Sequence, residues 1–151
     1  MAIDSTVTCI ADVHAVLGEG PVWVEREAAL YWVDIKGWKI FRIDEAGERR
    51  EWTTPFRVGS LVPRASGGFI AGTDEGIAEI DLDAGRFTII DNPEAHLPDN
   101  RFNDGKVDRS GRFWTGTMDD TEQQATGTLY RVAPDLTASA IDGGYKITNG
   151  P

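Results

Sequence analysis

The chain has 151 residues, of which 40% are hydrophobic and 26% charged, a composition typical of a globular domain and not of a disordered chain. Its formal net charge is -10, and because such a field repels phosphate backbones we expect no nucleic-acid partner. No apolar run approaches the roughly 20 residues that cross a bilayer, so we expect no membrane partner either.

The N-terminal segment gives two further expectations. Residues 1–5 have neither the basic nor the apolar part of a signal peptide, so the sequence predicts a cytoplasmic protein. The one cysteine, Cys9, cannot form an internal disulfide, and we expect it to be a small buried hydrophobic residue.

Short apolar runs rich in β-branched and aromatic residues, separated by Gly, Pro, Asp and Asn, predict an all-β chain. The predicted strands are residues 22–24, 29–34, 39–43, 59–63, 68–72, 76–80, 87–91, 103–107, 113–117, 127–131 and 138–141. Glycine-containing turns at residues 45–47, 83–85 and 109–111 separate several of these strands.

Three of the predicted strands form a repeat that begins with an aromatic residue, at Tyr31, Phe69 and Phe113. The starts are 38 and 44 residues apart, and a second strand follows each one. A period near 40 residues with about four short strands is the size of one β-propeller blade. A β-sandwich is the alternative, and we favour the propeller because aromatic and turn positions repeat together.

Three blades do not close a ring, because propellers typically have about 4–8 blades. The last residues, 147–151, also have the pattern of a strand that enters a turn. We therefore expect residues 1–151 to be the N-terminal part of a single β-propeller domain whose C-terminal blades are missing. Assembly of a ring from several chains is the less favoured alternative.

Two turns carry oxygen atoms that could bind a cation. Glu19 lies between two glycines and before a proline, so flexible backbone lets its carboxylate project from a strand end. Asn149 offers an amide oxygen, which suits a hard divalent cation. Taken separately, each segment is more typical of an ordinary exposed turn than of a cation site.

Residues 99–108 are unusually dense in side chains that bind oxygen-rich ligands. Arg101 offers a planar fork of donors, and Asn103 offers both an acceptor and donors. The segment leads into the third repeated strand, which indicates a position at the inner end of a blade. A polar surface loop would have a similar composition.

These segments together resemble the gluconolactonase/regucalcin (senescence marker protein) family of six-bladed propellers. The matching stretches are residues 17–23, 30–35, 58–60, 101–108, 111–118 and 148–151, in the order found in the family. The run at 101–108 and the Gly-Thr-Met motif at 116–118 are the most specific. The ending at 149–151 is most similar to the bacterial sugar-lactonase branch.

The resemblance implies one divalent metal ion, with Ca, Zn, Mg, Mn and Fe all open as its identity. Glu19 and Asn149 correspond to two of the family's metal ligands. The remaining ligand is an Asp that also acts as general acid/base in a later blade, so the resemblance implies no catalytic residue within this chain.

The resemblance also implies a small-molecule sugar lactone as the partner of the site. Arg101 and Asn103 correspond to residues that hold the lactone. An acidic substrate contact follows the Gly-Thr-Met motif in the family. Asp119, Asp120 and Glu122 are the candidates in this chain, and we favour Asp120.

The implied function is metal-dependent hydrolysis of a gluconolactone-like aldonolactone to the aldonic acid, a reaction of carbohydrate metabolism. A divalent ion can polarise a lactone carbonyl, and an adjacent carboxylate can accept a proton from water. We expect this activity in the intact parent protein and not in residues 1–151 alone. The alternatives are a calcium-binding regulatory propeller without enzymatic activity and an interaction propeller without cavity chemistry.

Overall fold

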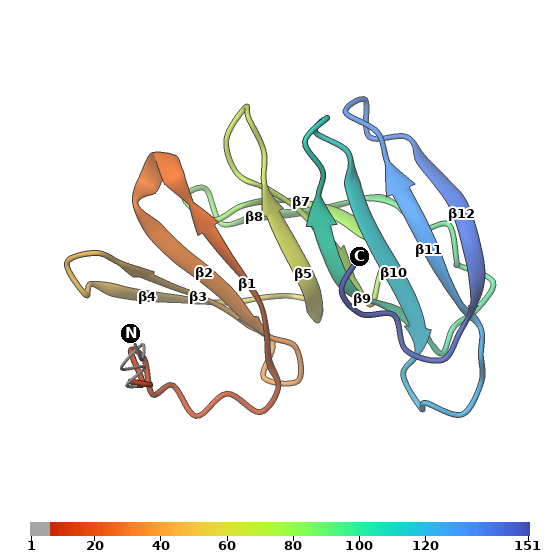
Figure 1. The fold of residues 1–151 in the computed structure, drawn as a ribbon, viewed down its shortest axis with the longest axis horizontal. Coiled ribbons are helices and arrows are strands. Elements are labelled where there is room, and N and C mark those ends of the chain that lie inside the picture. Colours follow the sequence, from red (N-terminus) through yellow and green to blue (C-terminus); the bar gives the residue numbers. More distant parts are fainter. Residues whose placement is uncertain (1–6) are drawn as a thin grey trace, which may run out of the picture.

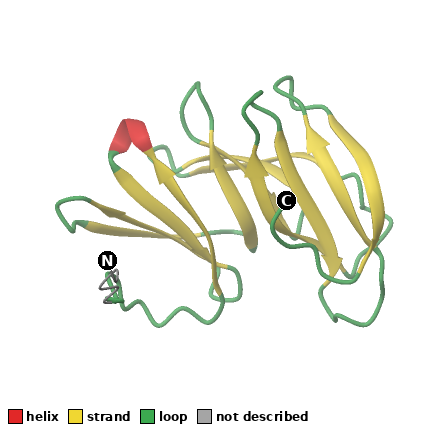
Figure 2. Cartoon of the chain, in the orientation of Figure 1, coloured by secondary structure: helices red, strands yellow, loops and turns green. Residues whose placement is uncertain are grey.

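A computed structural model describes residues 7–151, which form three antiparallel four-stranded sheets (Figure 1). The first blade contains β1 (Gly18–Val24), β2 (Ala29–Asp34), β3 (Lys39–Asp44) and β4 (Arg49–Thr53). The second contains β5 (Val58–Pro63), β6 (Phe69–Thr73), β7 (Ile77–Asp81) and β8 (Arg86–Asp91). The third contains β9 (Asn100–Val107), β10 (Phe113–Asp119), β11 (Gly127–Val132) and β12 (Ala138–Tyr145). A short 3-10 helix, η1 (Glu25–Glu27), joins β1 to β2 (Figure 2).

Each blade is a meander in which every strand pairs with the next strand of the chain. The blades contact one another mainly through their first strands, since β5 contacts both β1 and β9. These three inner strands therefore lie together, and the other strands of each blade extend away from them (Figure 1). The expectations of an all-β chain and of three blades are confirmed.

All eleven predicted strands are present, and the sequence missed one, β4 (Arg49–Thr53). This strand begins Arg-Arg-Glu and is mostly exposed, because it is the outer edge of the first blade. Charged residues on edge strands discourage pairing with other chains. A strand of this kind lacks the apolar alternation by which strands are predicted from a sequence. Trp52 is its one strongly apolar anchor, and its ring stacks on Tyr31 at 6.3 Å between centroids.

The buried core lies between neighbouring blades. One cluster packs the first blade against the second, where the rings of Tyr31 and Phe69 lie 4.9 Å apart. A second cluster packs the second blade against the third, with Phe102 and Tyr130 5.7 Å apart. Each fully buried aliphatic or aromatic side chain contributes about 1.5–3 kcal/mol, so the packing between blades fixes where the inner strands lie.

The segment before β1 corrects one expectation. Cys9 is exposed, and not buried as predicted, because residues 7–17 join no strand and residues 7–10 are all exposed. Residues 1–5, where we predicted no signal peptide, lie outside the described residues. No helix among residues 7–151 is long and apolar enough to cross a membrane.

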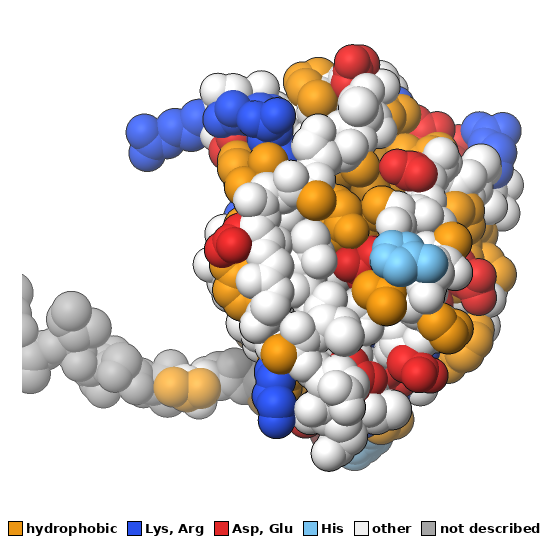
Figure 3. All heavy atoms as spheres, turned by 90° about the vertical axis from the view of Figure 1, so that its right-hand side faces the viewer, with side chains coloured by type: hydrophobic (Ala, Val, Ile, Leu, Met, Phe, Trp, Pro, Cys, Tyr) orange, Lys and Arg blue, Asp and Glu red, His pale blue; other side chains and the backbone are white. Residues whose placement is uncertain are grey.

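β12 is the outer strand of the third blade, and most of its residues are exposed. Ile141 in this strand is 46% exposed. Figure 3 views the molecule from this side, and apolar side chains there are interspersed with acidic ones.

Candidate functional site

The inner strands β1, β5 and β9 each carry an irregularity in their pairing near their first residues. In β1 it falls between Glu19 and Val22, and in β5 between Val58 and Ser60. In β9 the register shifts between Phe102 and Gly105. Bulges of this kind re-aim side chains and are common at barrel rims and active sites. The irregularities therefore make one end of the three inner strands the candidate site.

Arg101 and Asn103 lie at this end of β9, and both are buried, with 6% and 8% of their surface exposed. Arg101 Nε donates to Asp120 Oδ1 at 2.5 Å, and Arg101 Nη1 donates to Asn103 Oδ1 at 2.8 Å. Burial of a guanidinium and an amide is costly unless their donors are paired. The structure therefore brings together the three residues for which a substrate role was predicted.

The C-terminal segment returns to β9 after β12, and the C-terminus lies beside β9 in Figure 1. Asn103 Nδ2 donates to the Thr148 carbonyl oxygen at 2.8 Å and lies 3.4 Å from Asn149 Oδ1. Gly150 N donates to Asp104 Oδ2 at 2.7 Å. Two predicted site residues that are 46 positions apart in the chain, Asn103 and Asn149, are thus in contact.

Gly116 of the Gly-Thr-Met motif makes room for this segment. A Cβ atom on Gly116 would lie 2.3 Å from the Cβ of Thr148 and 2.4 Å from its Oγ1. Thr148 is buried, and its hydroxyl donates to the Thr117 carbonyl oxygen at 3.1 Å. The motif therefore has a steric reason, which is the close approach of the residue before Asn149.

The three acids that follow the motif have different surroundings. Asp119 accepts bonds from the amides of Thr121, Gln123 and Gln124, which fold the β10–β11 loop. These bonds, with the Gln124 amide first, lower the pKa of Asp119 to about 2. Glu122 is exposed, and its backbone amide donates to the Asp119 carbonyl oxygen.

Only Asp120 of these three acids contacts Arg101 within the described residues. Burial raises the pKa of the Asp120 carboxyl, but hydrogen bonds from Arg57 and Arg101 outweigh burial and hold the pKa below its usual value. An ionised carboxylate accepts hydrogen bonds from hydroxyl groups and donates none. This geometry suits a contact to sugar hydroxyls, and the substrate role of Asp120 stays a prediction.

Arg57, which precedes β5 at the same end of the blades, was not among the residues predicted from the sequence. Arg57 Nη1 donates to Asp120 Oδ2 at 2.7 Å, and Arg57 Nε donates to Asp74 Oδ2 at 2.8 Å. Arg57 and Asp120 are 63 positions apart and lie in different blades, so no local pattern links them. Alignment of the blades is the signal that could have found Arg57, because Arg57 precedes Val58 in the second blade as Arg101 precedes Phe102 in the third.

Glu19 lies at the start of β1 and is exposed. No hydrogen bond among residues 7–151 joins Glu19 to Arg101, Asn103 or Asn149. Glu19 instead lines a hollow of about 130 Å³ that it shares with Asp104 of β9. The structure therefore places Glu19 beside β9 without a direct bond to the other predicted residues.

Asp34 fixes the backbone that leads to Glu19. Its two carboxylate oxygens accept from the amides of Val16 at 2.8 Å and Leu17 at 2.9 Å, and from Gly37 at 2.9 Å. Asp34 is only 4% exposed. Burial raises the pKa of its carboxyl, but the backbone donors outweigh burial and the pKa lies below its ordinary value.

Glu19 and Asn149 share a local sequence motif. Each is followed by Gly-Pro, and Gly20 and Gly150 both adopt left-handed backbone, with φ of 56° and 63°. Glycine takes this conformation without the penalty of a Cβ atom. The two turns therefore have the same sequence pattern and a similar conformation at the two predicted ligands.

The atoms of Glu19 and Asn149 that could bind a metal ion are a carboxylate and an amide oxygen, and both kinds suit hard divalent cations. Glu19 and Asn149 are both exposed, so their oxygens are accessible to an ion. Residues 7–151 contain no group of three or more His, Cys, Asp or Glu side chains that could hold a metal ion. The two predicted ligands fit a divalent cation in chemistry but do not make a complete ligand set.

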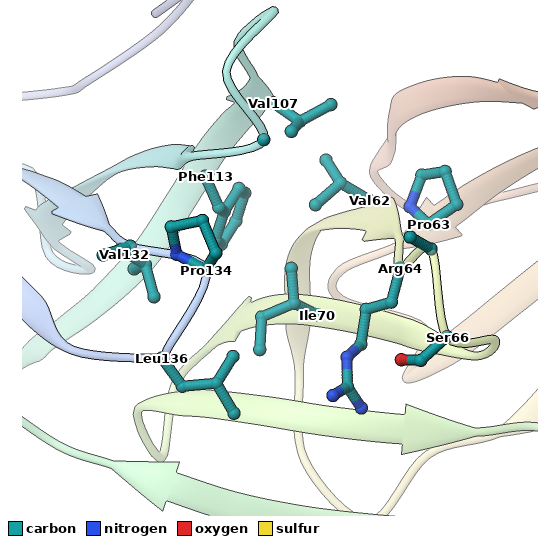
Figure 4. Close-up of a pocket in the computed structure, with 13 residues that line it drawn as sticks. Val62, Pro63, Arg64, Ser66, Ile70, Val107, Phe113, Val132, Pro134 and Leu136 are labelled. Carbon is teal, nitrogen blue, oxygen red and sulfur yellow. The ribbon is translucent and has the colours of Figure 1, made fainter.

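A larger hollow of about 430 Å³ lies between the second and third blades at the opposite end of the strands (Figure 4). Its walls are mostly apolar, formed by residues such as Val62, Ile70, Phe113 and Leu136. Arg64 at its rim is paired with Glu79 at 2.6 Å. A ligand site normally combines apolar walls with convergent polar groups, so the end that holds Arg101 and Asn103 is the better candidate.

Residues 17–151 match the family model described as SMP-30/Gluconolactonase/LRE-like region. The chain belongs to this family. It is 35% identical to a 6-deoxy-6-sulfogluconolactonase of Pseudomonas putida, over 98% of this chain and 51% of that protein. It is 37% identical to an L-arabinolactonase of Azospirillum brasilense, over 89% of this chain and 46% of that protein.

A solved structure of a calcium-binding protein, regucalcin, from Agrobacterium tumefaciens also matches, with a TM-score of 0.79 and 27% identity. The match covers 85% of this chain and 44% of that one. The chain therefore spans about half the length of the relatives that it matches. The resemblance seen in the sequence is confirmed, and the three blades correspond to half of the family's six-bladed propeller.

Proposed function

We propose that the complete gene product containing residues 1–151 is a metal-dependent lactonase that hydrolyses a gluconolactone-like aldonolactone to the aldonic acid. The observation that carries this proposal is the contact between Arg101, Asn103, Asp120 and Asn149 at one end of the inner strands. Homology to sugar lactonases supports it. Cytoplasmic location belongs to the same proposal.

In this proposal Glu19 and Asn149 provide two of the metal ligands. A bound divalent cation supplies Lewis acidity, which polarises a lactone carbonyl. Both proposed ligands are oxygen donors, so a hard cation such as Ca²⁺, Mg²⁺ or Mn²⁺ fits, and Zn²⁺ and Fe²⁺ are tested beside them.

Arg101 and Asn103 bind and orient the lactone. The guanidinium of Arg101 is held from two sides, by Asp120 and by the Asn103 amide oxygen. A donor fixed in this way needs little rearrangement when negative charge develops on the substrate oxygen. The Asp120 carboxylate accepts hydrogen bonds from sugar hydroxyls. The general acid/base Asp that accepts the proton from water is not among residues 1–151 in this proposal.

The test is hydrolysis of several aldonolactones by the complete gene product, after chelation and after return of each metal. We expect metal-dependent acceleration over the uncatalysed rate, and none from residues 1–151 alone. Glu19→Gln should weaken metal binding measured by calorimetry, while Glu45→Gln, an exposed glutamate in the β3–β4 turn, should not. Unchanged metal affinity in Glu19→Gln would remove Glu19 from the site.

A calcium-binding regulatory propeller without enzymatic activity is the second candidate. It is favoured by one observation, the similarity to a regucalcin described as calcium-binding. The same experiment separates the two functions. Calcium binding without acceleration of any lactone would favour the regulatory propeller and exclude the lactonase.

A further inference from the structure

We propose that Arg57 is a positioning residue, which orients the carboxylate of Asp120 for the substrate of the candidate site. This inference rests on the proposed function and adds a residue from the second blade to it. Arg57 does not contact Asn103 or Asn149 among the described hydrogen bonds, so it acts through Asp120.

Arg57 is itself rigidly held by Asp74. Arg57 N donates to Asp74 Oδ1 at 2.8 Å, and Asp74 N donates to the Arg57 carbonyl oxygen at 3.1 Å. The side chains form a further bond, from Arg57 Nε to Asp74 Oδ2 at 2.8 Å. Arg57 and Asp74 are thus connected by hydrogen bonds of their backbones and of their side chains, which leaves the Arg57 guanidinium little freedom.

Asp120 lies between two guanidinium groups, one from each blade. Its Oδ2 accepts from Arg57 Nη1 at 2.7 Å, and its Oδ1 accepts from Arg101 Nε at 2.5 Å. With both bonds in place the plane of the carboxylate is fixed. With the Arg101 bond alone the carboxylate could rotate about a single contact.

The carboxylate keeps acceptor capacity for a substrate. Each oxygen has two lone pairs, and each accepts one bond from an arginine. One third of the Asp120 side chain is exposed, whereas Arg101 is only 6% exposed. Asp120 is therefore the accessible member of this pair, and Arg57 determines the direction in which its free lone pairs point.

These bonds form a continuous chain of side chains: Asp74, Arg57, Asp120, Arg101, Asn103 and Asn149. It begins in the second blade and ends at a proposed metal ligand. Hydrogen-bonded groups in one such chain do not act independently, so a change at Arg57 should be felt at Asp120 first.

The test is a double-mutant cycle in the complete gene product, with kcat and KM measured on the lactone that the wild type hydrolyses best. Loss of a charge-assisted hydrogen bond that positions a substrate contact should lower kcat/KM about 10-fold or more in Arg57→Met, mainly through KM. In the Asp120→Asn background the same substitution should change kcat/KM by less than about 2-fold. Arg57→Lys should lose less than Arg57→Met, because it keeps a charge but not the planar fork.

Arg64→Met is the matched control, because Arg64 pairs with Glu79 at the far end of the same blade with similar exposure. We expect it to leave kcat and KM unchanged. If Arg57→Met does not fold, Arg57→Lys and Asp74→Asn enter the same cycle with Asp120→Asn.

If the losses in kcat/KM of Arg57→Met and Asp120→Asn multiply in the double variant, the two residues act independently. That result would overturn the inference while the proposed function stands. A folded Arg57→Met variant with wild-type KM would also overturn the inference. A wild-type protein that hydrolyses none of the lactones would overturn the proposed function, and this inference with it.

Discussion

Arg101 in β9 and Asp120, the residue after β10, are joined by a hydrogen bond of 2.5 Å from Nε to Oδ1. Antiparallel pairing brings them together, because Arg101 is opposite Met118 and Asn100 is opposite Asp119 in the ladder. The ladder of the third blade therefore brings this guanidinium and this carboxylate together, and Arg57 of the second blade supplies the second hydrogen bond to the carboxylate.

Asp120→Asn should weaken substrate binding in the complete gene product. The variant keeps the shape of the side chain but loses the charge between Arg57 and Arg101, and we expect kcat/KM to fall about 10- to 100-fold. Glu122→Gln, at an exposed position in the same loop, should leave kcat/KM unchanged. The reverse ranking in steady-state kinetics would assign the acidic contact to Glu122.

Gly116→Ala should destabilise the protein and loosen the segment that carries Asn149. The added Cβ would lie 2.3 Å from the Thr148 Cβ, and overpacking of this kind costs about 1–3 kcal/mol. Gly143→Ala is the control, because its Cβ would find its nearest neighbour at 3.6 Å. Urea unfolding of the two variants should separate them, and equal midpoints would contradict the steric role of Gly116.

Asp34→Asn should destabilise the first blade at neutral pH by about 1.5–3 kcal/mol, the usual range for loss of a charge-assisted hydrogen bond. The wild-type contribution of Asp34 is present above the unfolded Asp pKa of about 3.9 and is lost as pH falls through the lower pKa of the folded state. Unfolding measured between pH 7 and pH 2 should therefore bring wild type and variant together in acid. A parallel titration of Asp83→Asn, an exposed turn residue, should follow the wild type throughout.

Acid should loosen the β10–β11 loop through Asp119. Its pKa is lowered to about 2 in the folded state, so its hydrogen bonds are complete above about pH 4 and are lost as pH falls toward 2. Hydrogen exchange of the Thr121, Gln123 and Gln124 amides, corrected for the intrinsic rate, should accelerate over this range. Asp119→Asn should show the faster exchange already at neutral pH, and protection equal to wild type there would contradict the assignment.

Much of the fold could be predicted from the sequence. Aromatic-led strands that repeat near 40 residues, with glycine in the turns, identify blades because alternation and turn chemistry act over a few neighbouring residues. β4 was not predicted, because an exposed and charged edge strand has almost no apolar alternation. Cys9 was misjudged because residue type alone does not say whether a segment packs on a sheet.

The sequence also allowed five residues to be chosen as site candidates, through their chemistry and through the family resemblance: Glu19, Arg101, Asn103, Asp120 and Asn149. Their metal and substrate roles stay predictions until variants are measured. Neither local chemistry nor the resemblance pointed to the contact between Arg57 and Asp120, because these residues are 63 positions apart and lie in different blades.

The sequence by itself determined the turns and every strand of the described residues except β4, because these depend on local alternation and backbone preference. It also supplied the candidate polar side chains except Arg57. Only the tertiary structure decided which of these side chains meet. Packing of one blade on the next brings Arg57 to Asp120, and the return of the C-terminal segment past Gly116 brings Asn149 to Asn103. Contacts between repeats depend on the buried surfaces between blades, and no local pattern encodes them.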